Sequence, residues 1–314
     1  MKRYISSFLA LSCSLSLSAS AELIGYWNLD DNFDDSSGEG NDGTLFGGAT
    51  YSDDVPATLG AGKSVAFDGL PGTYGQINPG AGMAITALPE FSISMWVKGD
   101  GIANSDDRIF SEGQTTDVNP LFNVGTHNTS ADGRVDIYIR NGGGAETFGH
   151  AYSAGDAFDN TWHHVLVSGG ANGMLNLYID GVFDTTFDHS NVPAFTPDTT
   201  TIGGILRDTD CCNFFGSIDD VAVWNQELNE ADAAELFSGT SPVDLVVAPV
   251  DADMDGMRDD YEQIIIDFDP DDDIQTILDV LPDDDFDADM ASNIDEENVT
   301  DPTNPDNDAE GAIG

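Results

Sequence analysis

The chain has 314 residues, of which 58 are acidic and 9 are basic, and its formal net charge is −49. A charge of this sign and size excludes binding to nucleic acid phosphates and docking on an anionic membrane surface. Hydrophobic residues make up 40% of the sequence, which is enough to bury a core and argues against wholesale disorder. The 34 glycines favour a turn-rich β protein over a helical bundle.

The N-terminus has the pattern of an export signal. Lys2 and Arg3 precede an apolar, serine-rich stretch, and residues 19–21 read Ala-Ser-Ala, which matches a cleavage site. We therefore expect residues 1–21 to be removed and the mature protein to be secreted or to lie at the cell surface. The apolar stretch is too short and too rich in serine for a membrane span, and no other segment is long and apolar enough to span a bilayer.

The composition of the mature chain changes near residue 242. Residues 22–242 contain 33 acids and 6 bases, whereas residues 243–314 contain 25 acids and one base. We expect a folded domain over residues 22–242, a linker over 243–250 and an acidic tail over 251–314. The two regions would fold by different means, since only the first has enough apolar sequence for a large core.

Apolar and polar residues alternate with period two along several segments of the first region. Residues 91–97, 135–139 and 175–179 each show this pattern, which predicts strands with one buried face. Asp180-Gly181 lies between two such runs and is a favoured two-residue hairpin turn. Many short strands separated by turn residues indicate a sandwich or jelly roll.

One helix is predicted, at the end of the first region. Asn229 can cap it, and Glu230 and Asp232 place negative charge in the first turn, where the helix dipole favours it. Gly239 occupies the expected C-terminal cap. The predicted apolar stripe is Ala233, Leu236 and Phe237.

Six segments, taken in order, resemble the laminin-G-like, or concanavalin A-like, jelly-roll family. They are residues 23–30 with 35–45, 65–69, 91–98, 162–165, 177–181 and 215–225. The pair formed by Trp-His-His-Val from residue 162 and Leu-Tyr-Ile-Asp-Gly from residue 177 is the most telling. The resemblance runs over nearly all of residues 22–239, and it implies an all-β jelly-roll sandwich with one C-terminal helix.

The resemblance also implies a function. Members of this family mostly bind glycans or other proteins through loops at one rim, often with calcium nearby, and some relatives with this fold are glucanases. A retaining glucanase needs two carboxyl groups about 5–5.5 Å apart, and the sequence has no Glu-x-Asp-x-x-Glu or similar arrangement. We therefore expect a non-enzymatic protein that binds carbohydrate or an extracellular protein. The alternatives are a glycan-cleaving enzyme of the same fold and a structural adhesion protein.

Several residues are weighed as site candidates in this domain. By resemblance to the family, Asp35 and Asp219 are candidates for a structural calcium, and the alternative is that they accept hydrogen bonds from local backbone donors. His163 and His164 are expected to belong to a strand rather than to a catalytic site. The four tryptophans are expected to pack in the core or on a sheet face; they are Trp27, Trp96, Trp162 and Trp224.

The segment least like the family surrounds two adjacent cysteines, Cys211 and Cys212. Export permits disulfides, so the cysteines could form a vicinal disulfide, remain two free thiols or make an intermolecular link. On its chemistry alone this segment is a candidate recognition loop. Its candidate ligand-binding residues are Arg207, Asp208, Asp210 and Asn213.

Residues 251–262 fit the twelve-residue calcium loop D-x-D-x-D-G-x5-E. Gly256 takes the sharp turn at the sixth position, and the seventh position offers its backbone carbonyl. Such an acidic loop supplies the oxygen ligands that calcium requires. The predicted ligands are Asp251, Asp253, Asp255, Met257, Asp259 and Glu262.

A second loop over residues 285–296 has Met290 in place of the turn glycine, so we expect weaker binding there. Its predicted ligands are Asp285, Asp287, Asp289, Ala291, Asn293 and Glu296. The spacing of the two loops resembles bacterial thrombospondin type 3 repeats, which wrap calcium ions in series around little hydrophobic core. The pattern stops abruptly after residue 310, as it would in a truncated chain.

Overall fold

The computed structural model describes residues 23–78, 81–99, 105–141, 146–190, 194–208, 211–245, 265–266 and 280–281. Residues Ala21–Val247 form one compact unit, and residues 248–314 belong to a second. The predicted signal peptide lies outside the described residues, as do both predicted calcium loops. The fold below is that of the first unit.

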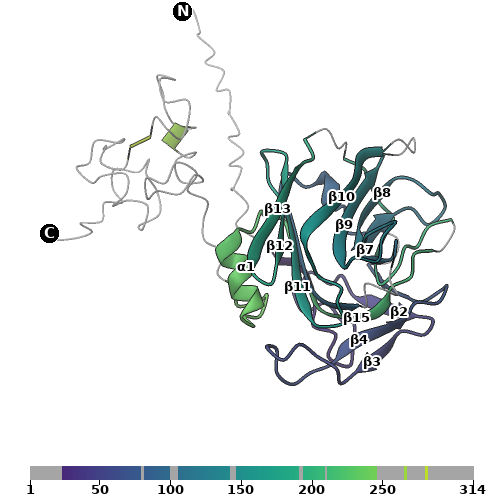
Figure 1. Ribbon diagram of the computed structural model, residues 1–314. Coiled ribbons are helices and arrows are strands. Elements are labelled where there is room, and N and C mark those ends of the chain that lie inside the picture. Colours follow the sequence, from purple (N-terminus) through teal and green to yellow (C-terminus); the bar gives the residue numbers. More distant parts are fainter. Residues whose placement is uncertain are drawn as a thin grey trace, which may run out of the picture. The chain divides into compact units, whose positions relative to one another are not determined.

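The described strands form two antiparallel sheets that face each other (Figure 1). In spatial order the eight-stranded sheet contains β13 (Val182–Asp188), β12 (Met174–Ile179), β11 (His163–Gly169), β6 (Phe91–Gly99), β15 (Phe215–Trp224), β4 (Ser64–Asp68) and β3 (Thr50–Ser52), and β1 (Leu23–Trp27) pairs with β15. The seven-stranded sheet contains β10 (Glu146–Asp156), β9 (Arg134–Arg140), β8 (Leu121–Thr126), β7 (Arg108–Gly113), β14 (Thr199–Ile202), β5 (Tyr74–Ile77) and β2 (Gly43–Phe46). This is the sandwich that the sequence predicts.

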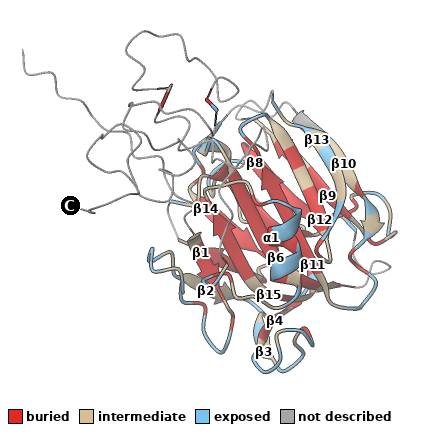
Figure 2. Cartoon of the chain, turned by 90° about the vertical axis from the view of Figure 1, so that its left-hand side faces the viewer, coloured by how far each residue is buried: buried red, intermediate tan, exposed pale blue. Residues whose placement is uncertain are grey.

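The main core lies between the two sheets, because most strands turn alternate apolar residues inward. The three alternating segments predicted to be strands are β6, β9 and β12, and their apolar positions belong to one buried cluster. Trp27 and Phe110 are fully buried in the same cluster. Figure 2 shows the buried residues running along the strands of the sandwich.

The predicted closing helix is confirmed. α1 (Glu230–Phe237) begins after Asn229, whose side chain accepts from the backbone of Asp232, while the Asp232 carboxylate accepts from the Asn229 backbone. Leu236 packs with Tyr178 and other residues of the eight-stranded sheet, so α1 covers the outer face of that sheet. No helix in the described ranges is long and apolar enough to cross a bilayer.

The predicted hairpin turn is also confirmed. Asp180 and Gly181 join β12 to β13, and both have positive φ angles, of 53° and 75°, as a type I′ turn requires.

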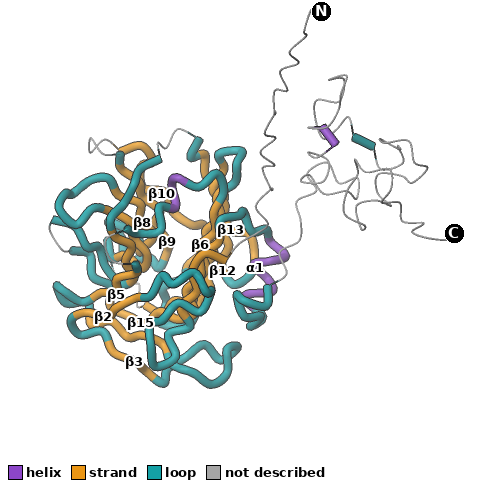
Figure 3. The backbone as a smooth tube through the Cα atoms, turned by 180° about the vertical axis from the view of Figure 1, so that it is seen from behind, coloured by secondary structure: helices purple, strands orange, loops and turns teal. Residues whose placement is uncertain are grey.

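Viewed from behind, the strands of the sandwich are connected by loops at their ends (Figure 3).

The two adjacent histidines have structural partners. His164 is buried on the outer face of the eight-stranded sheet, where its Nε2 lies 2.8 Å from Ser94 Oγ. His163 contacts the carboxylates of Asp180, at 2.8 Å, and Asp159, at 3.1 Å. Trp27, Trp96 and Trp224 are buried, as expected for packing residues. Trp162 donates from Nε1 to the Asp54 carboxylate.

Candidate functional site

Polar side chains form a row across the outer face of the seven-stranded sheet. Tyr138 of β9 lies opposite Asn123 of β8, and Asn123 lies opposite Ser111 of β7. The row continues across β14 and β5 through Thr201 and Gln76. Each of these residues has at least one strand neighbour in the core cluster, so the row faces away from the core.

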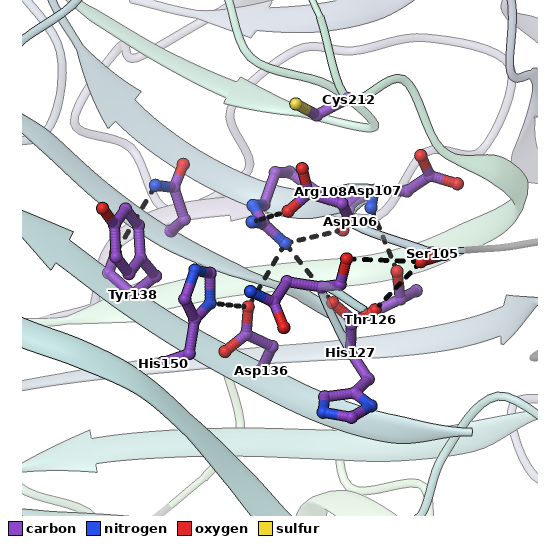
Figure 4. A network of polar contacts seen from close by, with 12 residues as sticks. Ser105, Asp106, Asp107, Arg108, Thr126, His127, Asp136, Tyr138, His150 and Cys212 are labelled. Atoms are coloured by element: carbon purple, nitrogen blue, oxygen red, sulfur yellow. Dashed lines mark hydrogen bonds and ion pairs between the residues drawn. The ribbon is translucent and has the colours of Figure 1, made fainter. Parts of the chain in front are cut away.

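Beside this row, where β7, β8 and β9 bring Arg108, Gly125 and Asp136 opposite one another, the arginine and the aspartate form a buried network (Figure 4). Arg108 of β7 contacts Asp136 of β9, with 3.5 Å between Nη1 and Oδ2, and Asp106, with 2.5 Å between Nη2 and Oδ1. The side chain of Asp136 is fully buried and that of Arg108 is 4% exposed. His150 of β10 contacts the same Asp136 oxygen from the other side, at 2.7 Å.

The glycine at position 125 makes this network possible. Gly125 of β8 lies opposite Arg108 in the ladder. A Cβ atom at Gly125 would lie 2.9 Å from Cδ of Arg108 and closer still to the carbonyl of Asp107. The arginine can therefore cross β8 and reach Asp136 on β9. Burial raises the pKa of Asp136, and the charges of Arg108 and His150 oppose that rise.

Three aromatic rings stand parallel beside this network. The rings of Tyr138 and His150 are 4.2 Å apart with 13° between their planes, and those of His150 and Tyr152 are 6.4 Å apart with 9° between their planes. An arginine lies over each end, with Arg140 5.7 Å from the centroid of Tyr138 and Arg134 5.4 Å from that of Tyr152. All five side chains are partly exposed.

The loop around the two cysteines lies against this part of the sheet. The Arg108 backbone N–H donates to the Cys212 carbonyl at 2.9 Å. Arg207 belongs to this loop, and its Nη2 donates to Sγ of Cys211 at 3.2 Å. Burial lowers the pKa of Arg207, and the charge of Arg140 lowers it further. We call the resulting surface the arginine face. It consists of Arg108, Arg134, Tyr138, Arg140, His150, Tyr152 and Arg207.

The other residues predicted in this loop differ in their surroundings. Asn213 is 8% exposed and donates to the Thr73 carbonyl at 3.1 Å, so it fastens the loop to the sheet. Asp208 is exposed, and Asp210 lies outside the described residues. The sulfur atoms of Cys211 and Cys212 are in contact as a vicinal pair.

Asp35, a predicted calcium ligand, is surrounded by local donors. Its carboxylate accepts from the backbone N–H groups of Tyr26, Ser37 and Asn41, each at 2.9 Å. These hydrogen bonds and the Ser37 hydroxyl lower the pKa of Asp35, although burial acts in the opposite direction and is the largest single influence. This geometry matches the alternative of a turn residue that satisfies backbone donors.

Asp219, the other predicted ligand, is adjacent to Asp220 in β15, which belongs to the eight-stranded sheet. A β-bulge in β15 between Asp219 and Ala222 interrupts the alternation there. Asp219 is 3% exposed, while Asp220 accepts from the Tyr26 hydroxyl at 2.6 Å. Both line a pocket of about 180 Å³, together with Asp30.

The pKa values of this pair are raised. Burial, and secondly the charge of Asp220, raises the pKa of Asp219 to about 9. Burial raises the pKa of Asp220 to about 6. Within the described ranges, no group of three or more His, Cys, Asp or Glu side chains is arranged to hold a metal ion. The twelve tail residues predicted to bind calcium lie outside those ranges, so that prediction stands on the sequence alone.

A comparison with known protein families matches residues 71–234 to Laminin_G_3, described as the concanavalin A-like lectin/glucanases superfamily. The match spans more than half of the chain. The chain belongs to this superfamily. No curated protein sequence matches the chain significantly.

Solved structures show the same superfamily fold at low sequence identity. Domain 4 of AbnA, an extracellular GH43 arabinanase from Geobacillus stearothermophilus, was solved in complex with arabinotriose. It is 19% identical, with a TM-score of 0.52, and the match covers 69% of this chain and 99% of that domain. The binding domain of botulinum neurotoxin serotype D is 14% identical, with a TM-score of 0.53, and the match covers 70% of this chain and 52% of that domain. The binding domain of Paraclostridial mosquitocidal protein 1 is 16% identical, with a TM-score of 0.50, and the shares are 69% and 52%.

Of the residues of the arginine face, only Arg207 was predicted from the sequence as a ligand-binding residue. The loop with Arg207 was singled out as a recognition loop. The signal for the rest was present in β9, where Asp136, Tyr138 and Arg140 alternate with core residues. An outward-facing Asp-x-Tyr-x-Arg pattern combines the charged and aromatic groups that are common in binding surfaces.

Proposed function

We propose that residues 22–242 bind a carbohydrate on the arginine face, as part of an exported recognition protein that is not an enzyme. The observation that carries this proposal is the partly exposed row of parallel rings flanked by guanidinium groups. Tyrosine and arginine dominate binding energies at recognition surfaces, because they combine large contact area with fixed hydrogen-bonding groups. The buried Asp136 pairs with Arg108 and also contacts the middle ring, that of His150, at 2.7 Å, which fixes the orientation of that ring.

Two further observations support a carbohydrate as the ligand. The arabinanase domain that shares this fold was solved with arabinotriose. The sugar hydroxyls of such a ligand match the polar groups offered here, which are phenol, imidazole and guanidinium. The loop with Arg207 borders the surface, so the predicted recognition loop and the arginine face would serve one ligand.

The proposal is tested by removing one ring. We expect Tyr138→Ala to weaken glycan binding at least about tenfold, because the ring contacts both His150 and Arg140. The measurement is titration calorimetry with whichever oligosaccharide binds the wild-type protein on a glycan array. Phe215→Ala is the matched control, since Phe215 is an aromatic residue of the other sheet and is 54% exposed.

Equal loss of affinity in both variants, or none in Tyr138→Ala, would place the ligand elsewhere. The non-enzymatic part of the proposal has its own check. New reducing ends released from bound glycans would contradict it, and Asp219 and Asp220 would then be the first carboxyl pair to replace.

We further propose that the tail binds calcium, on the pattern of residues 251–262 and 285–296. Calcium would fold these loops, because without it the tail carries many unpaired acids and little apolar sequence. Chelation should therefore speed amide hydrogen exchange and proteolysis across residues 251–296.

Two substitutions sharpen the calcium test. Glu262→Gln removes half of a bidentate ligand and should weaken binding to the first loop at least about tenfold. Met290→Gly restores the turn residue and should tighten the second loop. Exchange in residues 251–296 that is the same with calcium and with chelator would show that these loops do not bind the ion.

A further inference from the structure

A pocket of about 160 Å³ opens between the two sheets, at one end of the jelly-roll domain. Ile139 lines it and alternates along β9 with Tyr138 and Arg140 of the arginine face, so the pocket lies on the inner side of β9 and is a separate site. Four of the lining residues are buried and apolar, two from each sheet. They are Phe91 and Leu175 of the eight-stranded sheet, and Phe122 and Ile139 of the seven-stranded sheet.

Three aromatic rings line the pocket. Phe91 and Phe122 meet edge to face, with their centroids 5.8 Å apart, and the ring of His189 is tilted towards Phe91 at 6.2 Å. Aromatic rings prefer these arrangements, so a further ring that enters the pocket gains contacts of the same kind. Burial holds the pKa of His189 below its usual value, so its imidazole is uncharged at neutral pH.

A buried carboxylate fixes one wall of the pocket. This wall includes Thr86, which belongs to a short 3₁₀ helix over Ile85–Ala87. The carboxylate of Glu112, a fully buried residue, accepts from the backbone N–H groups of Met83 and Ile85, each at 2.9 Å. The helix that carries Thr86 is therefore held to β7 by hydrogen bonds from the segment that precedes it.

The facing wall is fixed by the turn that precedes β12. The Gly173 backbone N–H donates to the Gly170 carbonyl at 3.0 Å, and the His189 backbone N–H donates to the Gly173 carbonyl at 2.8 Å. The His189 ring is held as well, since its Nε2 lies 3.2 Å from the Met174 carbonyl. A pocket whose walls are already ordered loses little conformational entropy when it binds a ligand.

The polar groups of the pocket are few and uncharged. The Thr86 hydroxyl oxygen accepts from the Phe195 backbone N–H at 3.3 Å, and the hydroxyl donates to no acceptor within the described part of the chain. The Ser190 hydroxyl already donates to Asp188, at 2.6 Å. None of the described lining residues is charged at neutral pH. An ionic ligand would lose its hydration here without meeting a counter-charge.

The size of the pocket suits one six-membered ring. An engineered apolar cavity of about 150 Å³ in another protein binds one benzene molecule, and this pocket has about 160 Å³. Ligand pockets are typically lined by apolar and aromatic side chains with a few polar groups that fix orientation. The four buried apolar residues and the Thr86 hydroxyl match this description.

We propose that this pocket binds a small neutral aromatic molecule with a hydroxyl group, that is, a phenol. Its ring packs against Phe91 and Phe122, and its hydroxyl oxygen accepts a hydrogen bond from Thr86. The inference does not depend on carbohydrate binding by the arginine face, because the two sites lie on opposite sides of β9.

The test titrates phenol, toluene and benzoate calorimetrically into the wild-type protein. Phenol and toluene have rings of the same size, and only phenol has a hydroxyl. We expect saturable binding of phenol, and at least tenfold weaker binding of benzoate because of its charge. Absence of saturable binding by both phenol and toluene would overturn the proposal, as would benzoate binding as tightly as phenol.

A substitution at the pocket mouth locates the binding. Ala171 lines the pocket and is exposed, so Ala171→Trp should cover the opening without changing the core and should weaken phenol and toluene at least tenfold. Leu70→Trp is the matched control, since Leu70 is 60% exposed and does not line the pocket. Affinities in Ala171→Trp equal to those of the wild type would place the binding elsewhere and overturn the site.

Substitutions at Thr86 test the hydrogen bond. Thr86→Val keeps the shape of the side chain but removes the donor, and it should weaken phenol at least about threefold and leave toluene unchanged. Thr86→Ser keeps the hydroxyl and should retain phenol binding. Unchanged toluene binding in Thr86→Val shows that the pocket is intact. Equal affinity of the wild type and Thr86→Val for phenol would overturn the assignment of the hydroxyl contact to Thr86.

Discussion

Replacing Asp136 by alanine is expected to lower the free energy of unfolding of the jelly-roll domain by about 3 to 5 kcal/mol. The side chain of Asp136 is fully buried, and its Oδ2 contacts both Arg108 and His150. Its removal leaves the buried Arg108 guanidinium without its buried counter-ion, and an uncompensated charge of this kind is among the costliest single changes in a protein. Urea unfolding followed by tryptophan fluorescence measures the loss, because Trp27 is in the core.

Two comparison variants show whether burial is the cause. Asp106→Ala removes the other partner of Arg108, but the side chain of Asp106 is 49% exposed, so we expect a loss below about 1 kcal/mol. The double variant Arg108→Met, Asp136→Leu replaces the pair by apolar residues and should recover most of the stability. A single Asp136→Ala variant that unfolds at the wild-type urea concentration would show that the network does not support the sheet.

The same network explains which parts of the structure the sequence could predict. Alternation in a strand reports which face is buried, so β6, β9 and β12 were predictable from their own residues. The closing helix was predictable for the same reason, since its cap and its apolar stripe lie within a few residues of each other. Such features need no knowledge of distant contacts.

The arginine face depends on contacts between strands. Arg108 reaches Asp136 only because Gly125 lies between them and because β7 shifts its register between Arg108 and Phe110. His150 reaches the same carboxylate from β10, whose pairing with β9 is also irregular. Register shifts of this kind follow from the whole sheet and leave no signal in any one strand. The recognition loop was singled out by its unusual composition, a local property.

Asp219 supplies the second prediction, which concerns pH. Its pKa in the folded protein is about 9, well above the value near 3.9 of an unfolded chain. The folded state therefore holds a proton that the unfolded state releases, and the resulting stability is fully present below pH 4 and lost as pH rises towards 9. Asparagine keeps the oxygen that accepts from the Asp220 N–H and cannot ionise. Asp219→Asn should exceed the wild-type stability by about 5 kcal/mol at pH 8, since each pKa unit corresponds to about 1.4 kcal/mol, and the difference should vanish near pH 4.

Measuring the same stabilities with and without calcium tests whether Asp219 is a calcium ligand. The tryptophans all lie between residues 27 and 224, so their fluorescence reports the jelly-roll domain and not the tail. If calcium binds at Asp219, millimolar calcium should stabilise the wild-type domain at pH 8 and leave Asp219→Asn unchanged, because only an ionised carboxylate attracts the ion. If calcium stabilises neither, the pair is a buried structural carboxyl pair, and the pH dependence alone should remain. A variant that is less stable than the wild type at every pH would show that Asp219 is ionised and paired in the folded protein.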